Sequence, residues 1–258
     1  MKRPPTSKTI LVLVVIAGLI FIGWVFLGHR ADKGITPLHV SDTVPVSNGE
    51  WPSTKLRDAI VTDNASYYTI NATYPIVKDD VISGDFKTFV DDSIAQFKSD
   101  TSWAAANGSN APAEAGALSL HITYTEQKNA RVDNYVFSTT TYTGGAHDLQ
   151  ATTTFSFSAT GQQITLATLF TNGINGLGII APYVKAQLSS ALGADQGMIN
   201  DGTAPTETNY ENFTVQDDGV IFLFDPYQVA PYSAGAQSVK VPLSVFKSIA
   251  NPTIFPIQ

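Results

Sequence analysis

The sequence of 258 residues contains no cysteine and only four histidines. Without cysteine there is no disulfide framework, no thiol nucleophile and no thiolate-bound zinc. Only His121 and His147 lie beyond residue 58, and neither has a second histidine at the short helical spacing of a catalytic zinc site. We therefore expect no metal and no cofactor.

Acidic residues are missing from the first 30 positions, and basic residues are scarce in the rest. Four of the 15 Lys and Arg side chains lie in residues 1–30, which leaves 11 basic against 22 acidic side chains in residues 31–258. Proteins bind nucleic acids largely by neutralising phosphates with Lys and Arg. A net charge of −11 argues against a nucleic-acid partner, and an anionic membrane surface is disfavoured for the same reason.

Two common catalytic patterns are absent or incomplete. No G-x-S-x-G motif occurs, and the serines have no assigned His and Asp partners, so acyl transfer is unsupported. Gly173, Gly176 and Gly178 precede a predicted helix but follow a helical turn instead of a strand. This context does not match the dinucleotide fingerprint, and no dinucleotide is expected.

One long hydrophobic run is present, at residues 9–27, without a charge. As a helix it rises about 1.5 Å per residue and covers the roughly 30 Å hydrocarbon core of a bilayer. Basic residues precede it, and no small-x-small cleavage site follows it, which favours an uncleaved anchor over a signal peptide. We expect a cytoplasmic tail at 1–8, a single-pass location in the cell membrane, a linker at 28–58 and an extracytoplasmic body.

The body shows two periodicities. Apolar and polar residues alternate in Tyr67–Val77, which predicts a strand, and apolar residues three and four apart predict a helix over Gly84–Ser102. These two elements would form a small module at 59–110. The module at 111–258 would begin with an antiparallel meander of three strands, at Leu118–Gln127, Tyr135–Tyr142 and Leu149–Phe157.

The later part of the body completes the predicted fold. A second main helix ends at Gly193, and Val220–Phe224 is apolar on both faces, as in a central strand. Ser238–Val241 would pair beside that strand. The sum is an α+β fold in which an antiparallel sheet is combined with two main helices, preceded by the transmembrane helix and a stalk.

Two stretches stand out as candidate binding segments. In TYTGGAH, Gly144 and Gly145 would supply the positive φ angles of a hairpin turn and leave backbone amides uncovered beside Tyr142 and His147. A purely structural hairpin is the alternative.

The second stretch is FDPYQVAPYSAG, at residues 224–235. Here Asp225 ends the apolar strand, and Tyr227 and Tyr232 offer flat amphipathic rings of the kind enriched in binding sites. The alternative is a stiff crossover that packs its tyrosines on the sheet.

Together these stretches resemble the signature of the RsiV-like extracytoplasmic domain, over most of Ala65–Pro252. Members include the sensor region of a lysozyme-responsive anti-sigma factor and the non-catalytic N-terminal region of a peptidoglycan deacetylase. The resemblance implies a cell-envelope location, binding of lysozyme in the sensor branch, and no common enzymatic activity. Only about eight residues precede the predicted anchor, so we expect the exported module without a sigma-binding segment or a catalytic domain.

Three functions are compatible with these observations. The first is a non-enzymatic envelope module that binds a protein such as lysozyme, or peptidoglycan, through Tyr142, Gly144, Gly145, His147, Asp225, Tyr227 and Tyr232. The second is a wall-acting hydrolase with a carboxylate pair, which would need about 5 to 9.5 Å between the two groups. Its acids would be drawn from Asp148, Glu211, Asp217, Asp218 and Asp225. The third is a scaffold piece without a ligand. We favour the first.

Overall fold

The computed structural model describes residues 51–106, 118–171, 174–193 and 196–256. The predicted tail, the predicted anchor at 9–27 and the predicted module boundary near residue 110 lie outside these ranges. Within them, no helix combines the length and the apolar character needed to cross a membrane.

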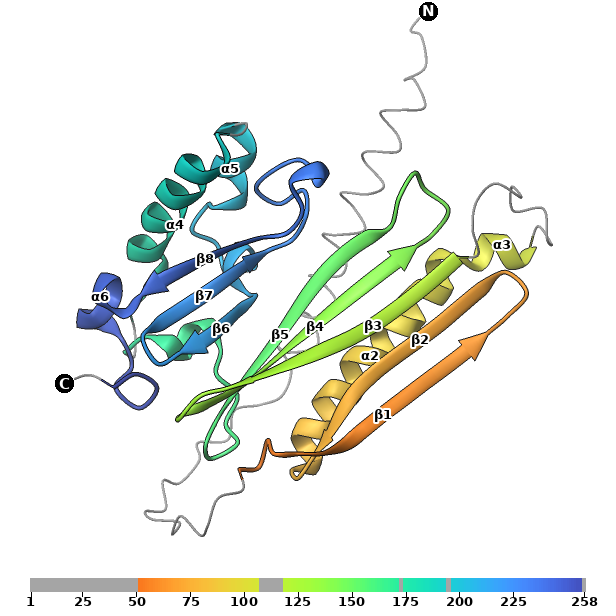
Figure 1. Cartoon of the computed structure of the whole chain (residues 1–258), viewed down its shortest axis with the longest axis horizontal. Coiled ribbons are helices and arrows are strands. Elements are labelled where there is room, and N and C mark those ends of the chain that lie inside the picture. Colours follow the sequence, from red (N-terminus) through yellow and green to blue (C-terminus); the bar gives the residue numbers. More distant parts are fainter. Residues whose placement is uncertain (1–50, 107–117, 172–173, 194–195, 257–258) are drawn as a thin grey trace, which may run out of the picture. The chain divides into compact units, whose positions relative to one another are not determined.

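The first sheet has five strands in the order of the sequence (Figure 1). They are β1 (Lys55–Asn64), β2 (Tyr68–Val77), β3 (Leu118–Lys128), β4 (Val132–Tyr142) and β5 (Leu149–Ser158). Neighbours pair antiparallel except β2 and β3, which are parallel. The prediction of a wholly antiparallel sheet is therefore wrong at this pair. The reason is that helical chain intervenes between β2 and β3, and such a crossover returns the chain to the end where β2 began.

Strand β1 was not predicted. Its first residues were assigned to the linker, and its sequence KLRDAIVTDN carries charges near both ends. The burial pattern explains the omission, because β1 has no fully buried residue. A strand without a buried face has no apolar alternation from which to recognise it.

Helix α2 (Asp80–Asp100) covers one face of the five-stranded sheet and is followed by α3 (Ser102–Ala106) (Figure 1). It begins four residues before the predicted start, because Asp79 caps it. The Asp79 carboxylate accepts the backbone N–H groups of Val81 and Ile82 at 2.7 and 3.2 Å. Phe86 is fully buried and contacts four rings of the sheet, those of Tyr135, Phe137, Phe155 and Phe157.

The second sheet is antiparallel, with β7 (Gly219–Phe224) between β6 (Phe213–Gln216) and β8 (Gln237–Pro242). The central position predicted for the apolar strand is confirmed. A separate core joins this sheet to the helices α4 (Leu177–Leu192), α5 (Gln196–Gly202) and α6 (Leu243–Phe246). Short 3-10 turns lie at Leu166–Leu169, Thr208–Tyr210, Tyr232–Ala234 and Lys247–Ile249. The fold is α+β, with a mixed sheet and a smaller antiparallel one.

One buried side chain links the two sheets. The Asn134 amide of β4 donates to the carbonyls of Val215 and Gln127 at 3.0 and 3.1 Å. Its oxygen accepts the Val215 N–H and the Ser156 hydroxyl, both at 2.8 Å. Asn134 is 1% exposed. Its amide therefore satisfies backbone hydrogen-bonding groups of β6 that water cannot reach.

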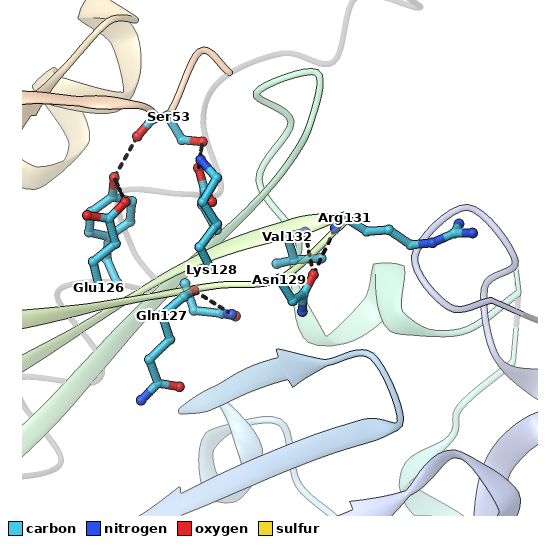
Figure 2. A network of polar contacts seen from close by, with 10 residues as sticks. Ser53, Glu126, Gln127, Lys128, Asn129, Arg131 and Val132 are labelled. Atoms are coloured by element: carbon cyan, nitrogen blue, oxygen red, sulfur yellow. Dashed lines mark hydrogen bonds and ion pairs between the residues drawn. The ribbon is translucent and has the colours of Figure 1, made fainter. Parts of the chain in front are cut away.

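A second buried polar network lies between the residues just before β1 and strand β4 (Figure 2). The Ser53 hydroxyl donates to the carboxylate of Asp133 at 2.5 Å, and the Tyr135 hydroxyl donates to the Ser53 carbonyl at the same distance. Lys128 approaches the same Asp133 oxygen at 3.0 Å. Ser53 and Asp133 are fully buried, so the residues just before β1 form part of the packed domain.

Candidate functional site

The structure brings together the rings of His147, Tyr227 and Tyr232, which we call the ring cluster. The centroids of His147 and Tyr232 lie 3.9 Å apart with an interplanar angle of 23°. Tyr227 lies 6.1 Å from His147 and 5.4 Å from Tyr232, also at small angles. The two parts of the cluster are 80 residues apart in sequence, and they come from the loop after β4 and the loop after β7.

Hydrogen bonds hold the three rings in this arrangement. The Asp148 carbonyl accepts the Tyr232 hydroxyl at 2.9 Å and lies 2.8 Å from His147 Nδ1. Because a carbonyl can only accept, Nδ1 carries a proton, and in the neutral imidazole Nε2 then accepts the Tyr227 hydroxyl at 3.1 Å. With these polar atoms engaged, the cluster offers mainly ring surface to a ligand.

Tyr227 has an unusual backbone. Its φ angle is +73°, and no other non-glycine residue in the described ranges has a positive φ. The conformation is costly for a bulky aromatic residue. The Gln228 N–H closes the turn by donating to the Asp225 carbonyl at 3.0 Å. The Tyr227 side chain is nevertheless 43% exposed, so the loop holds an aromatic ring toward solvent in a strained conformation, a combination typical of functional positions.

Asp225 lies at the base of this loop. Its half-buried carboxylate accepts the backbone N–H of Thr152 at 2.9 Å, and its own N–H donates to the Gln228 side chain at 3.2 Å. Burial raises the pKa of Asp225 to about 6, and the hydrogen bond from Thr152 opposes that shift. These contacts make Asp225 a residue that positions the Tyr227 loop against β5.

The structure places the hairpin residues Tyr142, Gly144 and Gly145, predicted to lie beside His147, in three different settings. Gly144 has a φ of +95°, whereas Gly145 does not have a positive φ, so only one of the two glycines supplies the expected conformation. Gly144 lies against Trp103 of α3. Tyr142 is half-buried at the end of β4, paired with Ser119 of β3, and it makes no ring contact with the cluster within the described residues.

A cleft of about 400 Å³ lies elsewhere, on the first sheet, and was not predicted. It is lined by Lys55, Asp58, Thr73, Thr123, Tyr124 and Glu126. The pairing of β2 with β3 ends at Ala72 and Ile122, and the cleft lies beyond that point. The Tyr124 hydroxyl and Lys55 both bind the Asp58 carboxylate, and they lower its pKa. The cleft could not be predicted from the sequence, because Lys55 and Asp58 belong to β1 and that strand was not predicted.

Two of the carboxylates considered for catalysis, Asp217 and Asp218, lie far from a third, Asp225. Asp217 and Asp218 lie in the turn before β7, whereas Asp225 follows the other end of that six-residue strand, a separation of roughly 20 Å. Asp218 binds Lys240 at 2.6 Å, which lowers its pKa, whereas a general acid needs a raised one. Neither turn residue can form a catalytic pair with Asp225. No three His, Asp or Glu side chains of the described residues are grouped so as to hold a metal ion.

Fold and surface together define an α+β domain with two sheets and an exposed aromatic cluster where their loops meet. Residues 167–244 match the family model described as a protein of unknown function, DUF3298. The chain therefore carries a DUF3298 domain. The RsiV-like sensor domain is of this family, so the resemblance found in the sequence is confirmed.

Several known proteins are similar to this chain. The peptidoglycan-N-acetylmuramic acid deacetylase PdaC of Bacillus subtilis is 27% identical over 253 residues, which cover 96% of this chain and 51% of that protein. The immunogenic protein MPT64 of Mycobacterium tuberculosis is 35% identical over 108 residues, or 41% of this chain and 46% of that protein. This chain spans about half the length of the curated relatives it matches.

A solved structure supports the fold. The crystal structure of a DUF3298 family member from Bacteroides fragilis superposes with a TM-score of 0.56, at 18% identity, over 80% of this chain and 98% of that one. At this level of identity the similarity concerns the fold alone.

Proposed function

We propose that this chain is a membrane-anchored binding module of the bacterial cell envelope and that the ring cluster is its contact surface. The observation that carries the proposal is the exposed ring of Tyr227, held at a φ of +73° beside two stacked rings. Strain of this kind persists only where the surrounding structure enforces it. Residues 9–27 would hold the module at the membrane.

Two ligands suit this surface. A cell-wall glycan would stack its apolar sugar faces on the tyrosine rings, and the relative PdaC is named for an activity on peptidoglycan. A lysozyme would be attracted by the net charge of −11 on residues 31–258, because lysozymes are commonly basic and opposite charges accelerate association. The distance of Asp217 and Asp218 from Asp225, at opposite ends of β7, favours either binding role over a hydrolase that pairs these acids.

The test is a binding titration of residues 48–258, which form one compact unit. This fragment retains Ser53 and its buried network. It is titrated with a basic lysozyme and, separately, with soluble peptidoglycan fragments, each at low and high salt. Charge-driven binding of lysozyme should weaken as salt rises, whereas stacking on an uncharged sugar should change little.

Variants then locate the contact. Tyr227→Asn removes the ring but tolerates a positive φ, so we expect the fold to persist and binding to fall about tenfold or more. His147→Ala should weaken binding because it removes the ring on which Tyr232 stacks and the nitrogen that accepts the Tyr227 hydroxyl. Tyr67→Ala, at a half-buried tyrosine between β1 and β2, is the matched control. Undiminished binding by Tyr227→Asn, or no binding to either ligand, would remove the ring cluster from the proposal and favour a scaffold.

A further inference from the structure

Strand β1 is an exposed edge. It pairs with β2 on one side only, and among the described residues no strand pairs with its other side. The strand is ten residues long, and its apolar side chains Leu56 and Ile60 are 62% and 73% exposed. An unpaired edge of this length, with exposed apolar side chains, is a template for pairing with a further strand.

The sequence of β1 is complementary to itself. Centred on Ile60, it has Arg57 three residues before and Asp63 three residues after. If a second copy of β1 pairs antiparallel with Ile60 opposite Ile60, each Arg57 lies opposite an Asp63, and each Ala59 lies opposite a Val61. Opposite residues of an antiparallel pair share a face and lie about 4.5–5.5 Å apart at Cβ, so this register gives two ion pairs, two Ala59–Val61 contacts and one contact between the two Ile60 side chains.

Existing contacts of Asp63 and Lys55 favour the ion pairs of this register. Asp63 Oδ2 binds Lys98 at 2.5 Å and accepts the Tyr68 hydroxyl at 3.2 Å. These contacts hold the carboxylate in place and keep it ionised. Lys55 binds Asp58 within its own strand at 2.8 Å, which leaves Arg57 as the cation of β1 for an incoming carboxylate.

We infer that β1 joins two copies of this chain into a dimer, by antiparallel edge pairing centred on Ile60. Residues 59, 61 and 63 lie opposite the buried residues 74, 72 and 70 of β2, and they therefore share the face that α2 covers. The two mixed sheets become one continuous sheet, with both copies of α2 on the same side.

Neighbouring registers are less favourable. A shift of one residue in each copy toward the start of β1 places Lys55 opposite Asp63, but Lys55 is already bound to Asp58 of its own strand. The same shift places Ile60 opposite Asp58, so that an apolar side chain faces a charge. The opposite shift places Asp63 opposite Ala59 and removes both ion pairs. Charge and apolar pairing thus select one register, and they select a second copy of this chain over an unrelated strand.

The absence of cysteine from the chain permits a direct test. Ile60→Cys in the full chain, in its membrane or in mild detergent, introduces a single thiol at the two-fold axis. Under mild oxidation we expect a covalent dimer to form at least several times faster than with Val81→Cys, whose position in the first turn of α2 is 74% exposed. Leu56→Cys should also cross-link slowly, because residue 56 lies opposite residue 64.

A second variant tests the ion pairs. Arg57→Asp in the Ile60→Cys chain places a carboxylate opposite Asp63 twice, so dimer formation should slow several-fold. Cross-linking no faster than at Val81→Cys, cross-linking unaffected by Arg57→Asp, or cross-linking mainly to another protein would each overturn the inference. The test is independent of the proposed function, because β1 contains no residue of the ring cluster.

Discussion

Asp225 accepts the backbone N–H of Thr152 at 2.9 Å across 73 residues, and this bond joins the end of β7 to β5, the last strand of the mixed sheet. A second side chain repeats the pattern, because Asn212 accepts the N–H of Thr154 at 3.2 Å. Side chains therefore satisfy amides of β5 that a sixth strand would otherwise satisfy. The two sheets are thus joined without merging into one.

The charge of Asp225 should oppose folding at neutral pH. Its pKa is raised from 3.8 to about 6 in the folded protein, so between those values the folded state binds a proton that the unfolded state releases. The stabilising contribution of this group to the free energy of unfolding is therefore complete below pH 4 and is lost as the pH rises through 6. Asp225→Asn keeps an oxygen for the Thr152 N–H and removes the charge.

We expect Asp225→Asn to raise the free energy of unfolding by about 1–3 kcal/mol at pH 7. The gain should disappear near pH 4, where the native carboxyl is protonated. Urea unfolding of both proteins at the two pH values is the measurement. An equal difference at both values would show that the carboxylate charge is not the cause.

Asn134→Ala should destabilise the junction of the two sheets. The substitution leaves the buried N–H of Val215 without its acceptor and removes the acceptor of the Ser156 hydroxyl. Buried groups that lose their partners cost about 1–3 kcal/mol each, so we expect a loss of about 2–4 kcal/mol in denaturant unfolding. Asn71→Ala, at an exposed position of β2, should stay within about 0.5 kcal/mol of the native chain.

Ser53→Ala tests the network at the start of the domain. It removes the hydroxyl that donates to the buried Asp133 carboxylate and leaves the backbone contact with Tyr135 intact. We expect a loss of about 1–3 kcal/mol.

Thr54→Ala is the matched control for Ser53→Ala. The Thr54 hydroxyl is buried without a hydrogen-bond partner in the described part of the chain, so its removal should cost about 0.5 kcal/mol or less. Similar losses for the two variants in thermal or urea unfolding would contradict the role assigned to the Ser53 hydroxyl.

Phe86→Ala should be among the most damaging core substitutions. Phe86 lies fully buried between α2 and four rings of the mixed sheet, and truncation of a buried phenylalanine typically costs about 3–5 kcal/mol. The measurement is the free energy of unfolding against Val81→Ala, on the exposed side of the same helix. A loss under about 1 kcal/mol would mean that the core closes around the smaller side chain.

Periodicity in the sequence identified elements with one buried and one exposed face. Strand β2 and helix α2 bury a regular set of apolar side chains. Strand β7, which lies between two other strands, has apolar side chains that are buried on one face and half-buried on the other. Strand β1 was missed because it has no fully buried residue. The start of α2 was misplaced because a single capping aspartate, Asp79, decided it.

The candidate site was only partly accessible from the sequence. The two conspicuous stretches contain His147, Tyr227 and Tyr232, but nothing local indicates that their rings stack or that the Asp148 carbonyl holds two of them. Asp225 was grouped with these residues because it is near in sequence. Its contact with Thr152, which the sequence did not indicate, gives it a supporting role for the loop.

The sequence by itself determined the absence of thiol chemistry, the acidic body, the main helices, most of the strands and the family to which the domain is related. These properties follow from composition and from short periodic patterns, which depend on neighbours within a few residues. The tertiary structure alone decided the parallel pairing of β2 with β3, the left-handed backbone of Tyr227 and the joining of side chains more than 70 residues apart. Such contacts depend on how the whole chain returns to one place, and no local pattern carries that information.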